Sequence, residues 1–394
     1  MNFTMVKPIM LNNITAIRRE MEKMGVDPTG IKIMEPKNIF FTIKVADLSL
    51  KAALLLKQEM LSKGGEAALP KKASMLAADK VDALLSGTKR QFQEVIKKLK
   101  TQPFGLNYLA TELERVLKNR DKNHYKLQLG EHTIYTGQRT IIMGILNVTP
   151  DSFSDGGRFT ELDASIKHAL QMVEDGVDII DVGGESTRPG YLPVSLEEEL
   201  ARVIPVIKQL KKETDVPISI DSYKAEVAKQ ALEAGAVMVN DVWGLKADPE
   251  MAAVVSSYNV PVCIMHNRKN AEYNDLLTDI MIDLQASISL AYEAGVSPDQ
   301  IIIDPGIGFA KNWEENLEVM NRQEEFKSMG FPLLLGVSRK STIGRILNLP
   351  ADERLEGTAA AVAVAIAKGA DIIRVHDVKE MKRVADMTDA IVRR

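Results

Sequence analysis

Three polar residues, Asp221, Asn240 and Asp304, each stand at the end of a short apolar run of this 394-residue chain. Carboxylate and amide groups at such places can pair with the ring N–H and amino groups of a flat polar heterocycle. A ligand without those groups would leave the carboxylates unsatisfied, so the pairing is selective in a dry site. Taken alone, each residue fits a cap or a turn equally well. Three in register favour a binding site.

A second group of residues is suited to an anion. Arg374 and His376 are two residues apart, so they share one face of an extended strand end. Arg188 stands in a predicted loop, and the run Ser338-Arg339-Lys340-Ser341 opens a helix whose first N–H groups also favour negative charge. These residues predict an anion site close to the heterocycle site.

Several function classes are excluded by motifs that the sequence lacks. It has no G-x-x-x-x-G-K-S/T loop, no H-E-x-x-H and no G-x-S-x-G, so nucleotide hydrolysis, zinc peptidase and α/β-hydrolase activities lack support. The single cysteine, Cys263, can form neither an internal disulfide nor a Cys₄ zinc site, which makes the cytoplasm the expected compartment. No secretory signal is visible, and the longest apolar run, 359–367, is too short to span a membrane.

The elements that must position these residues alternate between strand-like and helical patterns from Ile141 onward. The eight predicted strands are 141–146, 177–182, 217–221, 237–240, 261–265, 301–304, 332–336 and 371–375. Short β-branched runs separated by helices call for a parallel sheet. Residues 141–394 also match the roughly 250 residues of a (β/α)₈ TIM barrel, and the α/β barrel is therefore the predicted fold.

A doubly wound open sheet is the alternative fold. It is disfavoured because no G-x-G-x-x-G follows the first strand and because eight near-equal units favour closure. The active site of a TIM barrel lies at the carboxyl ends of its strands. The polar residues named above lie at the carboxyl ends of predicted strands or in the segments that follow them, as that rule requires.

Residues 1–120 form a different kind of region, predicted as a small α+β domain. A strand at 38–45, a helix at 49–63 and one apolar helical stripe from Val81 to Leu99 support that prediction. The region has nine more basic than acidic residues, although the whole chain has a net charge of −4. Few aromatic residues interleave its lysines, so a solvated face is favoured over a nucleic-acid site. Residues 121–140 are expected to be a linker and lead-in to the barrel at 141–394.

The residues around the predicted strand ends resemble those of one known family, the dihydropteroate synthases of folate biosynthesis. The most specific match is N-V-T-P-D-S-F-S-D-G-G at 147–157 with G-E-S-T-R-P-G at 184–190. Further matches lie at 220–222, 240–241, 304–311, 338–341 and 374–378, so the resemblance covers essentially all of residues 140–394. It implies a transferase that condenses 6-hydroxymethyl-7,8-dihydropterin diphosphate with para-aminobenzoate, giving 7,8-dihydropteroate and pyrophosphate.

The resemblance also implies a role for each matching residue. Asp221, Asn240, Asp304 and Lys340 would hold the pterin ring, whereas Asn147, Arg374 and His376 would hold the diphosphate, with Mg²⁺ near Asn147. Thr187, Arg188 and Pro189, with Asp151-Ser152-Phe153, match two loops that close over para-aminobenzoate, and Ser338 and Phe309 are further substrate contacts. The expected catalytic residues are Asp221, Lys340, Arg374 and His376. A homodimer is the implied assembly.

Two features depart from the family pattern. Residues 265–268 read Met-His-Asn-Arg where many members have Met-His-Met-Gln, and residues 1–120 are not part of the minimal synthase. The extra domain could dock on the acidic barrel, mediate oligomerisation or hold a neighbouring folate enzyme.

Two other functions compete with the synthase. A pterin-binding methyltransferase would need the same heterocycle site but has no use for the diphosphate residues. A non-catalytic pterin-binding protein is expected to have lost one or more of Asn147, Arg374 and His376, and all three are present.

Overall fold

The chain forms two compact units, Met1–Lys122 and Asn123–Arg394. The computed structural model describes residues 5–11, 13–148, 158–185 and 193–393. Within these ranges, no helix has both the length and the apolar character that crossing a membrane requires.

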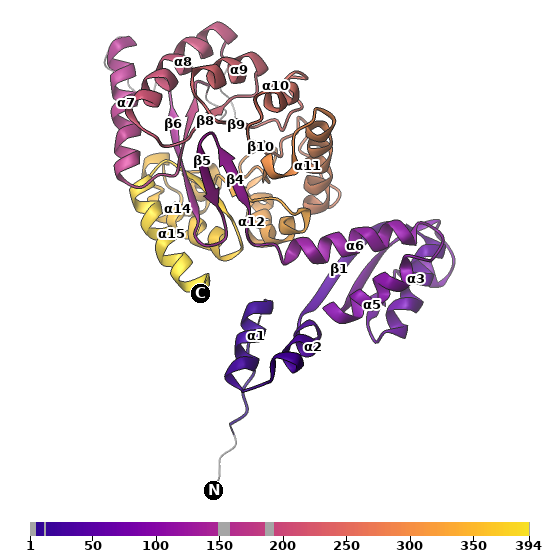
Figure 1. The fold of residues 1–394 in the computed structure, drawn as a ribbon. Helices are drawn as coiled ribbons and strands as arrows, with labels where there is room; N and C mark the ends of the chain where they lie inside the picture. The colour runs from indigo at the N-terminus through magenta and orange to yellow at the C-terminus, as the bar shows by residue number, and fades with distance from the viewer. Residues whose placement is uncertain (1–4, 12, 149–157, 186–192, 394) are drawn as a thin grey trace. The chain divides into compact units, whose positions relative to one another are not determined.

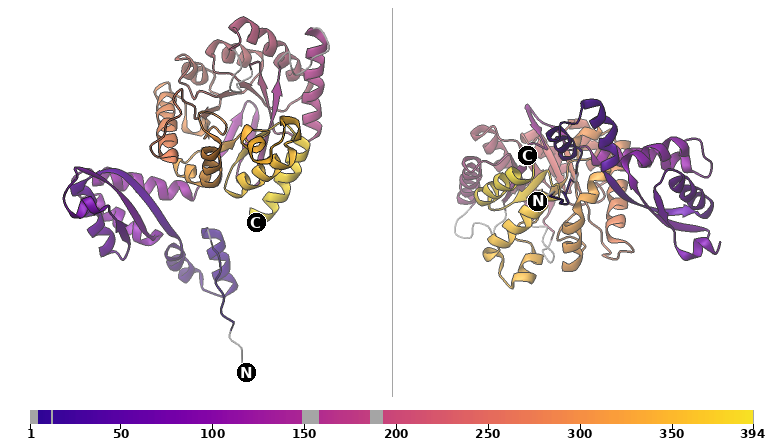
Figure 2. Two further views of the ribbon diagram at one scale, coloured as in Figure 1. Left: turned by 180° about the vertical axis from the view of Figure 1, so that it is seen from behind. Right: turned by 90° about the horizontal axis from the view of Figure 1, so that it is seen from below.

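The second unit is the predicted barrel, shown in Figures 1 and 2. Its parallel strands are β6 (Ile141–Asn147), β7 (Ile179–Gly183), β8 (Ile218–Asp221), β9 (Met238–Asp241), β10 (Val262–Met265), β11 (Ile301–Asp304), β12 (Leu334–Leu335) and β13 (Ile372–Val375). They follow the order β11-β10-β9-β8-β7-β6-β13-β12. A single parallel bridge between Ile303 and Leu333 brings the two ends together. The (β/α)₈ prediction is thereby confirmed, and the open sheet is excluded.

Helices cover the outer face of the sheet, and inward side chains fill the barrel, so both faces are buried, which explains the nearly continuous apolar strands. They are α7 (Arg158–Glu174), α8 (Leu196–Glu213), α9 (Ala225–Ala234), α10 (Met251–Tyr258), α11 (Leu276–Glu293), α12 (Trp313–Arg322), α13 (Ser341–Leu347), α14 (Leu355–Ala367) and α15 (Val378–Val392). Short 3₁₀ segments lie at Pro298–Gln300, Gln323–Met329 and Ala351–Glu353. The core of this unit therefore lies between the strands and the helices.

A β-hairpin closes the end of the barrel opposite the strand carboxyl ends. Its strands, β4 (Lys126–Leu129) and β5 (His132–Tyr135), fall in the segment expected to be a linker and lead-in. Leu127 and Leu129 are fully buried in one cluster with the first inward residues of the barrel strands, and Figure 1 shows the hairpin against the centre of the barrel. The segment is therefore the floor of the barrel and not only a connection.

The first unit contains an antiparallel sheet of order β1-β3-β2, with β1 at Phe40–Ser49, β2 at Glu66–Ala68 and β3 at Lys80–Thr88. Its helices are α1 (Ile14–Lys23), α2 (Pro28–Asn38), α3 (Leu50–Ser62), α4 (Lys71–Ser74), α5 (Lys89–Leu99) and α6 (Leu106–Arg120). Phe41 and Leu85 from the sheet share one core cluster with Leu56 of α3 and Phe92 of α5. The unit has α+β architecture.

The single helical stripe expected from Val81 to Leu99 is wrong in its first half. Residues 80–88 are the central strand β3, in which Val81, Ala83 and Leu85 are buried in strict alternation. The helix begins only after Thr88, whose side chain forms a reciprocal capping box with Gln91. Two elements with different periods had been combined into one pattern.

The hairpin floor generates the first prediction. A fragment of residues 123–394 should unfold cooperatively in urea, because it keeps every element of the second unit. A fragment of residues 141–394 should lose at least about 4 kcal/mol of unfolding free energy, since burial of two leucines is lost and the cluster beneath the strands opens to water. Equal urea midpoints for the two fragments, followed by circular dichroism, would show that the hairpin is dispensable.

Candidate active site

An ion-pair cluster occupies the centre of the barrel at the carboxyl ends of the strands. Arg374 of β13 reaches across to two carboxylates, with Nε 2.6 Å from Asp181 Oδ2 and Nη2 2.5 Å from Asp221 Oδ2. Asn240 of β9 donates its Nδ2 hydrogen to the same Asp181 oxygen at 2.9 Å. Strands β7, β8, β9 and β13 are thereby joined through polar side-chain contacts in the barrel interior.

Two oxygens of this cluster have no partner. Oδ1 of Asp181 and Oδ1 of Asp221 are buried and lack a hydrogen bond among the described residues. A buried acceptor left unpaired costs about 1–3 kcal/mol, and more when it is charged. The arrangement is therefore suited to a ligand that brings N–H donors into the barrel.

The electrostatics of the cluster follow from its burial. Burial raises the pKa of Asp221, and the neighbouring Asp181 carboxylate acts in the same direction, whereas Arg374 opposes both. The flanking carboxylates raise the pKa of the Arg374 guanidinium against the effect of its own burial. The Arg374 cation is therefore stabilised between the two acidic side chains.

Asp304 lies at the end of β11 and faces the same interior. Its Oδ1 accepts the N–H of Gly306 at 2.7 Å. Burial raises the pKa of Asp304 to about 6, opposed by that hydrogen bond and by the cations Lys340, Lys311 and Arg374. Lys340 Nζ lies 4.5 Å from the ring centroid of Phe309 in the turn after β11, which is cation–π geometry. Residues from β11 and the end of β12 therefore face one another.

Ser338 and His376 form a pair beside this interior. The Ser338 hydroxyl accepts the backbone N–H of His376 at 3.2 Å and lies 2.9 Å from His376 Nδ1. If the hydroxyl donates its own hydrogen to Nδ1, the ring proton resides on Nε2, where it can bind an anion. Asn147 ends β6 and is half-buried.

The structure thus brings together most of the residues predicted from the sequence. Asn147, Asp221, Asn240, Asp304, Phe309, Ser338, Lys340, Arg374 and His376 all lie at or just beyond strand carboxyl ends. Thr187, Arg188 and Pro189, with Asp151-Ser152-Phe153, lie outside the described residues. Asp181, which contacts both Arg374 and Asn240, was missed, although a lone aspartate inside an apolar strand is itself a signal, because a buried charge needs a partner.

Comparison with known proteins agrees with this geometry. Residues 143–376 match a family described as pterin binding enzyme. A dihydropteroate synthase of Clostridium beijerinckii is 57% identical over 269 residues, which are 68% of this chain and all of that protein. A crystal structure of a dihydropteroate synthase from Clostridium difficile, determined in the presence of pteroic acid, is 55% identical with a TM-score of 0.65, covering 66% of this chain and 99% of that one.

A third relative extends into the first unit. A probable bifunctional folylpolyglutamate synthase/dihydropteroate synthase of Halobacterium salinarum is 41% identical over 391 residues, which are 96% of this chain and 46% of that protein. The first unit therefore has a counterpart elsewhere.

The fold and the site together define a pterin-binding TIM-barrel enzyme, and the chain belongs to the pterin-binding enzyme family. Within that family it belongs to the dihydropteroate synthases, transferases of folate biosynthesis. The methyltransferase and non-catalytic alternatives are accordingly set aside.

The central ion pairs generate the second prediction. Asp181→Ala should lower the unfolding free energy by about 3–5 kcal/mol, because it leaves Arg374 and the Asn240 amide with unpaired buried groups. Asp386→Ala removes an exposed partner of Lys382 on α15 and should cost less than about 0.5 kcal/mol. Urea denaturation of both variants measures the difference, and equal losses would contradict the importance of the buried cluster.

Proposed function

We propose that the barrel joins 6-hydroxymethyl-7,8-dihydropterin diphosphate to para-aminobenzoate, with the pterin ring in the central cluster. The observation that carries this proposal is the pair of unpartnered oxygens on Asp181 and Asp221. Asn240, which contacts Asp181, and Asp304 at the end of β11 add an amide and a further carboxylate at the same end of the barrel, a set of groups suited to a ring with N–H and amino groups. A ligand of that kind would satisfy buried acceptors that have no partner among the described side chains.

The pterin contacts follow from the chemistry of each side chain. Asp221 and Asp304 accept hydrogens from the ring, Asn240 supplies an amide, and Lys340 donates to a ring acceptor. The Nζ of Lys340 also lies over the ring of Phe309, so we expect the lysine to approach the pterin from the loops beyond the strand carboxyl ends. Arg374 favours the ionised form of Asp221 through its ion pair, against the effect of burial, which adds a role to the diphosphate contact proposed for it.

The diphosphate is proposed to lie between Asn147, Arg374 and His376. The described residues contain no group of three or more His, Cys, Asp or Glu that could hold a metal ion. Mg²⁺ is commonly bound through one or two protein ligands together with substrate phosphates, so the sparse donor set fits an ion that arrives with the diphosphate and contacts the Asn147 amide oxygen. Bound there, Mg²⁺ would neutralise charge on the leaving pyrophosphate.

The chemical step needs charge stabilisation more than proton transfer. Departure of pyrophosphate leaves a carbocation-like methylene that is delocalised into the pterin ring, and the aryl amine attacks it. The Arg374 guanidinium and the His376 ring N–H stabilise the leaving group. Because the aryl amine is only weakly basic, it needs no strong general base. The proposed para-aminobenzoate contacts are Ser338, Phe309 and the segments with Thr187, Arg188 and Pro189.

The proposed assembly is a homodimer in the cytoplasm. Apolar side chains are exposed on neighbouring helices α14 and α15, namely Val364, Met387, Ile391 and Val392. Such a patch supports an interface through these barrel helices. For the first unit, the three roles considered above stay open, and the fusion to a folylpolyglutamate synthase in the relative from Halobacterium salinarum favours a place beside another folate enzyme.

The experiment that tests the proposed function is pyrophosphate release by the purified chain with the pterin diphosphate and Mg²⁺. Release that depends on para-aminobenzoate, with a dihydropteroate product, is the expected result. Asn147→Ala should raise the Mg²⁺ concentration needed for half-maximal release about tenfold, since one metal contact is lost. Pterin binding without release under any condition would contradict the synthase reaction.

The raised pKa values give a prediction for pH. Asp304, whose pKa is raised to about 6, accepts ring hydrogens best as a carboxylate, so protonation competes with the pterin. Affinity for 6-hydroxymethylpterin should be constant well above pH 7 and weaken by up to about tenfold per pH unit below 6. Calorimetric titration between pH 5 and 8 measures this change. Asp304→Asn should bind more weakly at pH 8 and show a shallower dependence, whereas a flat profile in the unmodified protein would contradict the assignment.

A further inference from the structure

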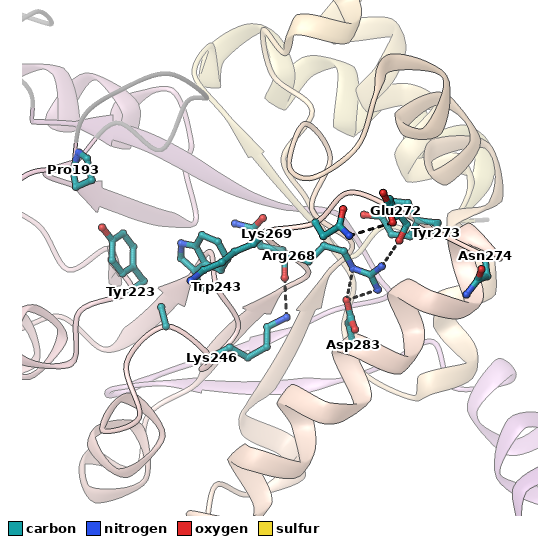
Figure 3. Close-up of a pocket in the computed structure, with 13 residues that line it drawn as sticks. Pro193, Tyr223, Trp243, Lys246, Arg268, Lys269, Glu272, Tyr273, Asn274 and Asp283 are labelled. Atoms are coloured by element: carbon teal, nitrogen blue, oxygen red, sulfur yellow. Dashed lines mark hydrogen bonds and ion pairs between the residues drawn. The ribbon is translucent and has the colours of Figure 1, made fainter.

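A polar cluster behind the proposed pterin site has no part in the reaction described so far. It joins the end of β10, helix α11 and the turn after β11 through His266, Asp283 and Lys311. Its outer edge lines a groove of about 1170 Å³, in which Arg268, Tyr273 and Asp283 are drawn in Figure 3. The contacts of the cluster form a continuous chain from the helix to the turn.

Lys311 is the inner end of this chain. Its Nζ lies 2.9 Å from His266 Nδ1 and 3.1 Å from each of the carbonyl oxygens of Gly306 and Phe309. Three acceptors match the three hydrogens of an ammonium group. Burial lowers the pKa of Lys311 to about 7, opposed by the Asp304 and Glu315 carboxylates. The three contacts fix the position of the Lys311 Nζ.

His266 connects Lys311 to the helix. The imidazole is buried, and its burial together with the cations Lys311, Lys246 and Arg268 lowers the pKa of His266 to about 2. The ring is therefore neutral. The Asp283 Oδ2 atom, which also accepts from Arg268, lies 3.1 Å from Nε2, so the ring proton resides on Nε2 and is donated to that oxygen. Nδ1 then accepts a hydrogen from the Lys311 Nζ. The tautomer is fixed from both sides.

The turn held in this way carries two proposed substrate contacts, Asp304 and Phe309. The His266 N–H donates to the Asp304 carbonyl at 2.8 Å. Gly306 has φ +71°, and a Cβ there would lie 2.1 Å from the His266 carbonyl oxygen, so only glycine fits between the two segments. A shift of Lys311 or His266 therefore moves the backbone between Asp304 and Phe309.

A second path supports the same turn from the groove. Arg268 Nε and Nη2 lie 2.9 and 2.8 Å from Asp283 Oδ2, and the guanidinium carbon is 4.6 Å from the Tyr273 ring centroid. Tyr273 donates its hydroxyl hydrogen to the Ala310 carbonyl at 2.6 Å. The departure from the family pattern at Arg268 is thus accommodated as an ion pair with Asp283.

We propose that Lys311, His266 and Asp283 are positioning residues for the pterin, acting as one hydrogen-bonded chain that fixes the turn from Asp304 to Phe309. The inference rests on the proposed function, in which Asp304 contacts the pterin ring. His266 and Lys311 contact the backbone of Asp304 and Phe309. The three positioning residues therefore act on the affinity for the pterin by fixing the position of this turn.

The test measures the dissociation constant of 6-hydroxymethylpterin by calorimetry in the full chain. Lys311→Met keeps the length of the side chain but removes every donor, and Asp283→Asn weakens the distal end on α11. Each should raise the dissociation constant, by about tenfold or more for Lys311→Met, which loses three hydrogen bonds from a charged group. Asp279→Asn is the matched control: it lies one turn earlier on α11, accepts from the Asn274 N–H and should leave affinity unchanged.

The double variant separates a chain from independent effects. If the residues act as one unit, Lys311→Met/Asp283→Asn should bind within about twofold of Lys311→Met alone. A dissociation constant of the double variant that equals the product of the two single-variant effects would overturn the proposal. Unchanged affinity in both single variants, whatever their melting temperatures, would overturn it as well. Should Lys311→Met fail to fold, unchanged affinity in Asp283→Asn would overturn it by itself.

A further variant separates this inference from the proposed function. Asp304→Asn should also weaken binding of 6-hydroxymethylpterin. If it does not, the pterin site itself is misplaced and the positioning chain falls with it. If Asp304→Asn weakens binding while Lys311→Met and Asp283→Asn do not, only the positioning chain is wrong.

Discussion

The site depends on one buried guanidinium. Arg374 compensates two carboxylates, Asp181 and Asp221, in the interior of the barrel, where either carboxylate alone would be costly to bury. With the arginine in place, each carboxylate retains one oxygen without a partner in the part of the chain that the structure describes. The same interaction therefore makes the acidic interior tolerable and leaves acceptors for a ligand. Both effects require the barrel to bring the inward side chains of β7, β8 and β13 within contact distance of one another.

Closure of the barrel supplies that geometry. The strands contribute only two to seven residues each, and the ring is completed by one bridge between Ile303 and Leu333. Asn240 and Arg374, from distant parts of the sequence, both contact Asp181 because closure brings the inward side chains of alternate strands into shared layers. Around this ring, the turns after the strands are held by their own polar contacts, as the Lys311 and His266 contacts illustrate. The backbone is thus fixed before a substrate arrives.

The sequence predicted the barrel well because each parallel strand is a short apolar run ending in polar residues, a local pattern. It also predicted which polar side chains lie at the carboxyl ends of the strands, since those ends meet at one edge. Asp181 was missed because it lies within its strand, and its partner Arg374 is 193 residues away. The hairpin was missed because four-residue strands barely show a period, although Gly130 with positive φ in a two-residue loop is a hairpin signal. In the first unit, Val81 to Leu85 were assigned to a helix because Leu84 and Leu85 fit both periods.

The hairpin beneath the barrel also has a consequence for synthesis on the ribosome. Leu127 and Leu129 are translated before nearly all of the strands whose residues cover them, and Leu334 and Ile372 of the same cluster come close to the end of the chain. At ordinary elongation speeds this interval is on the order of tens of seconds. During this interval the apolar side chains of the hairpin are not yet covered by the barrel strands, and such exposed apolar surface is what ribosome-associated chaperones bind.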